Sequence, residues 1–264
     1  MSLQSSALWP FAEYTANLKP EDLPEDALHA AKRCLLDWFA AALPGTVIEP
    51  ATLLTKAFSD CIGRGGARLY PSGQETDART AAFINGAASH TVEFDDIYRN
   101  ALYHPGVPVI SAALAMAQAR GVSGARLLTG IVAGYEVSNR LGAAANPAHY
   151  EFWHTTGTIG SLGAAAAAAN ILGLNAEQSL HALANATTLA AGLQQAFRAD
   201  AMASITPVET PIFASDQHPG AVRQTMESLE GADVESLVQV KQADFFELEP
   251  RTDGGMLVFN PPYG

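Results

Sequence analysis

The stretch TTGTIGSLGAAAAAANILGLNA, residues 155–176, contains no charged side chain. Its length raises the question of a membrane span, which needs about 20 predominantly apolar residues. Glycine, alanine, threonine and asparagine fill most of the stretch, however, so it presents little bulky apolar surface. We therefore interpret residues 157–172 as a buried, tightly packed helix that ends at Gly173, and we expect no membrane partner.

Helical patterns continue on both sides of this stretch. Leu28, Ala31, Leu35, Phe39 and Ala42 recur at helical spacing, and Pro44-Gly45 ends the pattern. Further helices are expected at 51–60, 77–92, 107–120, from a cap at Ser123 to about 141, and from a capping box at Asn175 and Gln178 to 191, with a loop or short hairpin over 63–73. Gly130 and Gly134, on adjoining turns, would allow a neighbouring helix to approach closely. These patterns predict an all-α domain.

Composition excludes several classes of partner. The chain has 264 residues with 48% hydrophobic content, enough to bury a core in one large or two ordinary domains. Its formal charge of −12 disfavours nonspecific attraction to nucleic acid or anionic lipid. Cys34 and Cys61 match neither a disulfide framework nor a metal knuckle, and residues 1–10 lack a signal-peptide pattern. We expect a cytoplasmic protein.

One segment rich in histidine and carboxylates lies where a helix ends. It begins with His90, contains Glu93, Asp95 and Asp96, and continues to His104-Pro105-Gly106. Neighbouring carboxylates raise one another's proton affinity unless a cation intervenes, which can tune an acid or base toward neutral pH. Histidines titrate usefully beside them. The segment is a candidate site of acid–base catalysis.

A second segment, FWHTTGTIG, residues 152–160, lies where a helix begins. His154 is followed by Thr156, Gly157 and Thr158. The unpaired N–H groups at a helix amino terminus form a natural carboxylate site. We expect this segment to bind an anionic substrate beside the acid–base groups.

Structural roles remain open for these residues at this point. Asp95-Asp96 could cap the turn at Ile97, and His104 or His154 could bond a carbonyl. A metal site of His90, Glu93 and His104 is conceivable, but the spacing is not a recognised zinc pattern, and we expect no metal. No Walker loop and no G-x-G-x-x-G motif after a strand is present.

Three ordered motifs resemble the MmgE/PrpD family. They are residues 90–113, residues 154–160 with the helix at 164–169, and LGLNAEQ at 172–178. The resemblance spans about residues 5–203. It implies an all-helical larger domain, a homodimer, no metal or organic cofactor, and acid–base chemistry next to a carboxylate of a small di- or tricarboxylate.

The resemblance also implies roles for single residues. Glu93 stands where many members have the first aspartate of an Asp-Phe-Asp-Asp run, Asp95 and Asp96 match its last pair, and His104 and His154 match two active-site histidines. Asp96 and His104 would handle the proton, while His154 and the helix entrance at Thr156–Thr158 would bind an oxygen of the substrate. Glu93 and His154 also count among the catalytic candidates. The substrate would be bound by a set comprising Asp95, His90, Thr156, Gly157 and Thr158. Ile97 replaces a threonine of some members, which weighs against decarboxylation.

The resemblance implies further parts that this sequence lacks. Family members continue after about residue 202 into a lysine-containing segment and an α/β domain that lends residues to the pocket, whereas this chain continues ASITPVETP at 203–211. We therefore expect a truncated lyase or epimerase that is itself inactive.

The last sixty residues have a different rhythm. Residues 212–216, 237–244 and 256–259 read as strands and 219–229 as a helix, which implies a parallel α/β sheet. The segment resembles part of an S-adenosylmethionine-dependent methyltransferase of the ribosomal RNA guanine type, with nucleic acid as partner. That resemblance implies that Asp216 and Asp244 bind the cofactor and that Asn260, Pro261, Pro262 and Tyr263 bind the target base.

The sequence thus predicts a mainly α protein with a short, incomplete Rossmann-like segment. We expect a helical domain over 1–203, a junction at 204–210 that proteases cut first, and a methyltransferase-like segment over 211–264. Three functions remain in competition: a lyase or epimerase on a small carboxylate, an RNA or DNA N-methyltransferase fragment, and a non-catalytic dimeric interaction protein.

Overall fold

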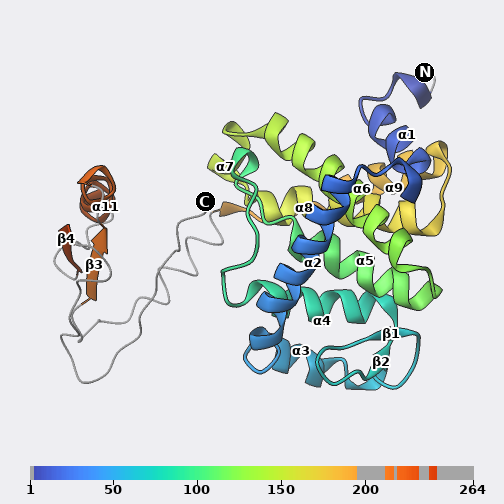
Figure 1. Cartoon of the computed structure of the whole chain (residues 1–264), viewed down its shortest axis with the longest axis horizontal. Helices are drawn as coiled ribbons and strands as arrows, with labels where there is room; N and C mark the ends of the chain where they lie inside the picture. The colour runs from blue at the N-terminus through green and yellow to red at the C-terminus, as the bar shows by residue number, and fades with distance from the viewer. Residues whose placement is uncertain (1–2, 195–211, 217–218, 232–237, 243–264) are drawn as a thin grey trace. The chain divides into compact units, whose positions relative to one another are not determined.

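The computed structural model describes residues 3–194, 212–216, 219–231 and 238–242. The chain divides into two compact units, Met1–Ala201 and Met202–Gly264. The described part of the first unit consists mainly of α-helices (Figure 1). They are α1 (Trp9–Asn17), α2 (Glu25–Gly45), α3 (Ala51–Ala57), α4 (Ala78–His90), α5 (Gly106–Arg120), α6 (Gly124–Ala145), α7 (Ala148–Phe152), α8 (Thr155–Leu172) and α9 (Ala176–Thr188). The predicted mainly α fold is confirmed.

Short elements connect these helices. Single 3₁₀ turns cover η1 (Leu3–Ser5), η2 (Pro20–Asp22), η3 (Ser59–Cys61) and η4 (Arg99–Ala101). The strands β1 (Ala67–Arg68) and β2 (Glu75–Thr76) pair antiparallel, with Ala67 opposite Thr76. The short hairpin predicted around residues 63–73 is therefore present.

Helix α8 lies at the centre of the first unit and packs against α5, α6 and α9. Its apolar residues do not gather on one face, because neighbours cover it on several sides. A Cβ atom added to Gly134 of α6 would lie 2.8 Å from the carbonyl oxygen of Gly163 in α8, and one added to Gly130 would lie 2.6 Å from Ile171. The predicted close helix approach is confirmed. Among the described residues, no helix combines the length and the apolar character that crossing a membrane requires.

Local sequence signals place several helix ends correctly. The Ser123 hydroxyl accepts from the Arg126 N–H, and Asn175 and Gln178 form the expected capping box. Helix α8 starts two residues before the expected Gly157, and α9 ends at Thr188 instead of 191. The caps fix helix starts well because their side chains replace missing intrahelical acceptors.

The described part of the second unit forms a strand–helix–strand segment. It contains β3 (Ile212–Asp216), α11 (Pro219–Gly231) and β4 (Val238–Gln242), and β3 pairs parallel with β4 with Ile212 opposite Val238. The predicted parallel pairing is confirmed for these strands. Asp216 ends β3. The expected junction, the expected strand at 256–259, and Asp244, Asn260, Pro261, Pro262 and Tyr263 lie outside the described residues.

Candidate active site

The loop between α4 and α5, residues 91–105, carries most of the predicted site. An isolated antiparallel bridge between Tyr98 and Tyr103 joins two parts of this loop. Glu93 and Leu102 have positive φ angles of 55° and 48°. Side chains other than glycine rarely adopt this conformation, and such strained backbone persists where the surroundings fix it. The loop therefore holds a defined shape around its carboxylates.

Asp95 lies at the centre of a histidine pair. It is 7% exposed, and Nδ1 of His90 lies 3.1 Å from its Oδ1 and 3.2 Å from its Oδ2. Nδ1 of His104 lies 3.1 Å from Oδ2. Burial alone would raise the pKa of Asp95, but the interactions with His104 and His90 outweigh it and lower the pKa to about 2. Asp95 is therefore ionised over the neutral range.

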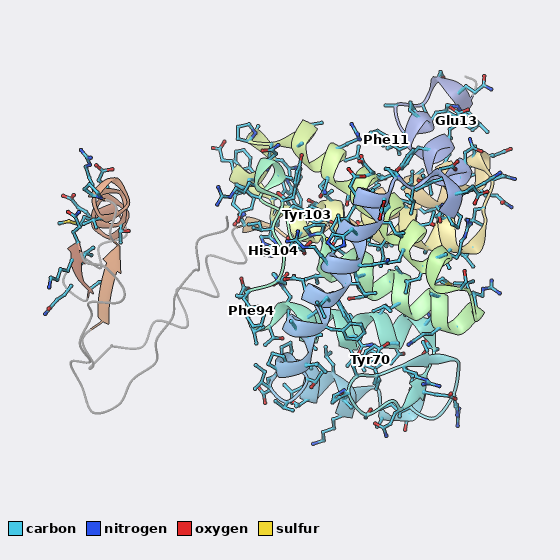
Figure 2. All side chains as sticks on the ribbon, viewed as in Figure 1. Phe11, Glu13, Tyr70, Phe94, Tyr103 and His104 are labelled. Carbon is cyan, nitrogen blue, oxygen red and sulfur yellow. The ribbon has the colours of Figure 1, made fainter. Side chains whose placement is uncertain are left out.

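His104 lies just before α5 (Figure 2), and its Nδ1 contacts the Asp95 carboxylate. Its contact with the carboxylate is close but poorly aligned, because Nδ1 has no hydrogen-bond partner of good geometry among the described residues. Its backbone N–H donates to Oγ1 of Thr156 at 3.2 Å, which joins the loop to the start of α8. The Asp95 carboxylate raises the pKa of His104 more than burial lowers it. This imidazole favours the protonated form.

Asp96 is a partly buried acceptor and does not cap the Ile97 turn. Its Oδ1 accepts the N–H of Gly106 at 2.9 Å, and its Oδ2 accepts the hydroxyl of Tyr135 at 2.8 Å. Its own N–H donates to Oδ2 of Asp37 at 3.1 Å. Burial, with Asp37 and Asp95 nearby, raises the pKa of Asp96 to about 6 despite these hydrogen bonds. The carboxyl group can thus exchange a proton near neutral pH.

Gly106, the first residue of α5, is small because Asp96 lies against it. A Cβ atom there would lie 2.6 Å from Oδ1 of Asp96 and 3.1 Å from the Tyr135 hydroxyl. Real Cβ atoms do not approach this closely. The glycine therefore allows the amino end of α5 to bind the carboxylate directly, in the position where a helix favours negative charge.

His154 is the residue before α8. Its N–H donates to the carbonyl oxygen of Gly192 at 2.7 Å. Burial, and then the charges of His90 and His104, lower the pKa of His154. The site thus holds one imidazole that favours the protonated form and another that favours the neutral form, an arrangement that suits an acid and a base.

The residues after His154 are largely bonded within the protein. The hydroxyl of Thr156 accepts from His104, and that of Thr158 lies 2.7 Å from Nε2 of His149. A Cβ atom on Gly157 would lie 2.5 Å from the Ala191 carbonyl oxygen. Thr156 is thus joined to the loop at residues 91–105, whereas Thr158 contacts His149 and Gly157 lies against Ala191.

Asp95, and not Glu93 as the sequence suggested for a metal site, is the carboxylate nearest to His90 and His104. Glu93 is exposed, and its Oε1 lies 3.9 Å from Nε2 of His90. Donor atoms of His90, Asp95 and His104 instead lie within 4.8 Å of one another. The three residues that could hold a metal ion are therefore His90, Asp95 and His104, with Asp95 in place of Glu93.

Two contributors to the site were not predicted. Tyr135, on α6, and Asp37, on α2, both bond to Asp96. Asp37 carried a weak signal, since it interrupts the apolar run Leu35–Phe39 of an otherwise amphipathic helix. Tyr135 carried none, because its contact depends on how α6 packs against the loop.

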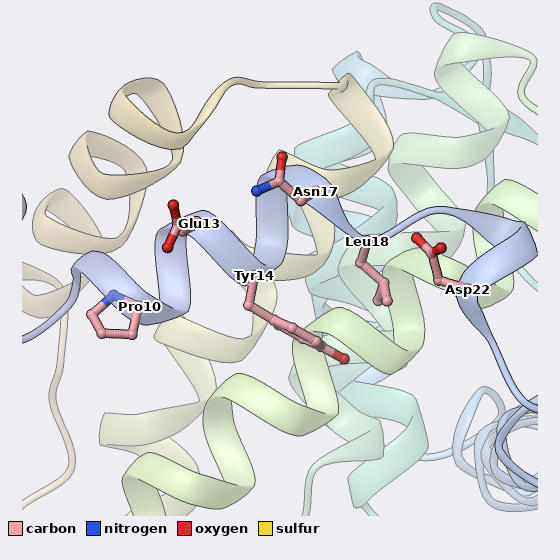
Figure 3. Close-up of a pocket in the computed structure, with 6 residues that line it drawn as sticks. All are labelled: Pro10, Glu13, Tyr14, Asn17, Leu18 and Asp22. Carbon is pink, nitrogen blue, oxygen red and sulfur yellow. The ribbon is translucent and has the colours of Figure 1, made fainter.

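A cleft at the other end of the first unit lies apart from these residues. Its lining comes from α1 and η2: Pro10, Glu13, Tyr14, Asn17, Leu18 and Asp22 (Figure 3). Glu13 and Asp22 make it acidic, so it does not suit a carboxylate ligand. None of the catalytic candidates lines it. The chemistry therefore points to the loop cluster.

Comparisons with known proteins identify the family of this chain. The model of the MmgE/PrpD N-terminal domain matches residues 10–215, a range that reaches into β3. The cis-aconitate decarboxylase-like protein oryM of Aspergillus oryzae is 33% identical over 192 residues, 69% of this chain and 40% of that protein. Cis-aconitate decarboxylase of Homo sapiens is 34% identical over 191 residues, 67% of this chain and 38% of that protein.

A further relative is more distant. Cis-aconitate decarboxylase of Aspergillus terreus is 28% identical over 190 residues, 69% of this chain and 39% of that protein. This chain thus spans about two fifths of the length of the curated relatives it matches. The matched part contains the loop cluster and the start of α8.

Proposed function

This chain belongs to the MmgE/PrpD family, and we propose that it supplies the acid–base groups of a lyase or epimerase that acts next to a carboxylate of a small di- or tricarboxylate. The observation that carries the proposal is the contact of His104 with Asp95 at 3.1 Å, together with the bond from the His104 N–H to Thr156, which joins this cluster to the start of α8 after His154. In these surroundings the pKa of His104 is raised and that of His154 is lowered. Dehydration and epimerisation at such a carbon need one group that accepts a proton and one that donates it, whereas decarboxylation needs a group that donates a proton to the carbanion left when carbon dioxide departs.

The proposed roles follow from the surroundings of each group. Neutral His154 accepts the proton from the carbon next to the carboxylate. Protonated His104 donates a proton to the leaving hydroxyl in a dehydration, or to the opposite face of the same carbon in an epimerisation. Asp95 keeps His104 charged through the 3.1 Å contact. Glu93 and His90 lie beside this group, with Oε1 of Glu93 3.9 Å from Nε2 of His90.

Asp96 is the third group that can exchange a proton. Its pKa of about 6 lies close to neutrality, and Gly106 and Tyr135 hold it at the start of α5. The amino end of α8, with Thr156 joined to His104, supports binding of a substrate carboxylate there, because helix amino termini favour anions. Gly157 and Thr158 shape this helix entrance. None of these steps calls for a metal or organic cofactor.

Solvent exchange tests the proposal with the protein as it is. Cis-aconitate, named in several relatives, has a CH₂ group next to a carboxylate. In contrast to the inactivity expected from the sequence, the proposal predicts that the protein exchanges this hydrogen for deuterium in D₂O, as detected by proton NMR. His104→Gln and His154→Gln should each slow the exchange by at least about 100-fold. His181→Gln, an exposed histidine on α9, is the matched control.

Two results would contradict the proposal. Absence of exchange with the unaltered protein would remove the assigned acid–base function on this substrate. Equal exchange in all variants would show that His104 and His154 do not carry it. Helical circular dichroism of each variant separates a loss of function from a loss of fold.

The methyltransferase function remains a prediction. The parallel β3–β4 pair agrees with it, but Asp244 and residues 260–263 lie outside the described residues, and the family match extends through Ser215. Calorimetric titration with S-adenosylmethionine tests it: one-to-one binding would support it.

A further inference from the structure

We propose that His90, Asp95 and His104 form a binding site for a divalent transition-metal ion, with Zn²⁺ as the best fit. Two imidazole nitrogens and a carboxylate oxygen are ligands that zinc accepts in three-residue protein sites. The inference concerns binding alone and does not depend on the proposed reaction.

The distances between the donor atoms favour such an ion. Nδ1 of His90 and Nδ1 of His104 each lie 3.1 Å from an oxygen of Asp95. Zn–N and Zn–O bonds of about 2.0–2.1 Å in a tetrahedron separate neighbouring ligands by roughly 3.3 Å. The two nitrogen–oxygen pairs are therefore already close to the required spacing.

The remaining pair requires only a small adjustment. All donor atoms of the cluster lie within 4.8 Å of one another. The widest pair must therefore approach by at most about 1.5 Å to reach the ligand separation of a tetrahedral zinc site. Rotation of the imidazoles can supply this movement. The His90 and His104 rings lie with centroids 4.9 Å apart and are inclined at 60°, so neither ring stacks flat on the other.

The backbone around the ligands is well fixed. His90 is the last residue of α4, and the His104 N–H is bonded to Thr156. Asp96, next to Asp95, is tied to Gly106 and to Asp37. Ligands held in this way lose little conformational freedom when they bind an ion.

Two observations at the cluster itself point to a ligand. Nδ1 of His104 is buried and has no aligned hydrogen-bond partner among the described residues, although a buried polar atom is normally bonded. The Asp95 side chain is 2% exposed, while that of His90 is 27% exposed. The buried Asp95 carboxylate would supply negative charge to the ion, and the partly exposed His90 imidazole would let the ion enter from solvent.

An ion here would occupy Nδ1 of His104 and remove the proton that this residue carries in the proposed reaction. The site would therefore compete with acid–base catalysis instead of assisting it. Metal binding and the proposed reaction would therefore exclude each other at these residues, and a bound ion would inhibit the reaction.

Titration with the metal alone tests the site. We expect isothermal calorimetry with Zn²⁺ to give saturable binding at one site, and Co²⁺ to give the visible absorption of a tetrahedral complex. His90→Gln and Asp95→Asn should each weaken binding more than about tenfold, since loss of an outer partner alone costs about 10- to 100-fold. His181→Gln controls for the surface pair His181–Glu177.

Each outcome decides the matter. Loss of affinity in His90→Gln and Asp95→Asn with retention in His181→Gln supports the site. Absence of saturable binding, or binding that these two variants leave unchanged, overturns it. If Asp95→Asn lowers the helical content, His90→Gln alone decides, because its half-open side chain tolerates replacement more readily.

Discussion

Nδ1 of His104 lies 3.1 Å from Oδ2 of Asp95, and this contact joins the most buried carboxylate of the loop to the imidazole that precedes α5. The charge of Asp95 favours a proton on His104, and the histidines favour an ionised Asp95. The pKa of Asp96, the next residue, is raised instead, because desolvation disfavours its charged form and the neighbouring carboxylates are negative as well.

Asp95→Asn should destabilise the first unit in the pH range where Asp95 is ionised. The folded-state pKa of about 2 lies below the ordinary value of 3.8, so its ionisation stabilises the fold above pH 4 and this stabilisation is lost as the pH falls toward 2. A shift of nearly two units corresponds to about 2 kcal/mol. Urea unfolding at pH 6 and at pH 2.5 measures it. A cost that is equal at both pH values would contradict the assignment.

Asp96→Asn should have the opposite pH dependence. The raised pKa of about 6 means that the folded protein binds more protons than the unfolded chain between pH 4 and 6, so its stability falls as the pH rises through this range. The difference amounts to about 3 kcal/mol. The variant should lack this decline in urea unfolding across the same pH series. If the unfolding free energy of the variant fell with pH as it does in the unaltered protein, a group other than Asp96 would be responsible.

Tyr135→Phe should raise the pKa of Asp96 further. The variant removes the O–H that donates to Oδ2 at 2.8 Å and favours the charged form. Loss of this hydrogen bond should lower the unfolding free energy by about 1–3 kcal/mol at pH 7, and by less at pH 4, where Asp96 is protonated. Unfolding free energies at both pH values test this, and the reverse order would exclude the hydrogen bond as the cause.

Gly106→Ala should disturb the start of α5. The added Cβ would lie 2.6 Å from Oδ1 of Asp96, so the carboxylate must move or the helix end must shift, at a cost of about 1–3 kcal/mol. Gly124→Ala, at the first residue of α6, is the matched control, since no atom lies within 4 Å of its Cβ position. Thermal unfolding of both variants measures the difference. Equal melting temperatures would show that the space at Gly106 does not matter.

The sequence predicted much of the helical fold because periodic apolar residues and caps act locally. The start of α6 at Ser123 and of α9 at Asn175 illustrate this. The helices α1 and α7 were not predicted. Helix α7 has only five residues, too few for a periodic pattern to be recognised. The parallel β3–β4 pair followed from a strand–helix–strand rhythm.

The candidate site was predictable only in part. His90, Asp95, Asp96 and His104 share one loop, so their closeness could be read from sequence. Which carboxylate faces the histidines could not, because that depends on the positive φ angle at Glu93. The partners of Asp96 come from α2 and α6, and only tertiary packing brings Asp37 and Tyr135 to the loop.

The most direct test of the central claim is an NMR titration of the histidine imidazoles. Spectra of histidine-labelled protein, assigned with His104→Gln and His154→Gln, give the pKa of each ring. We predict that His104 titrates above 6.5 and His154 below it, and that Asp95→Asn lowers the pKa of His104. A His154 pKa above that of His104, or a His104 pKa that Asp95→Asn leaves unchanged, would contradict the proposed acid–base pair.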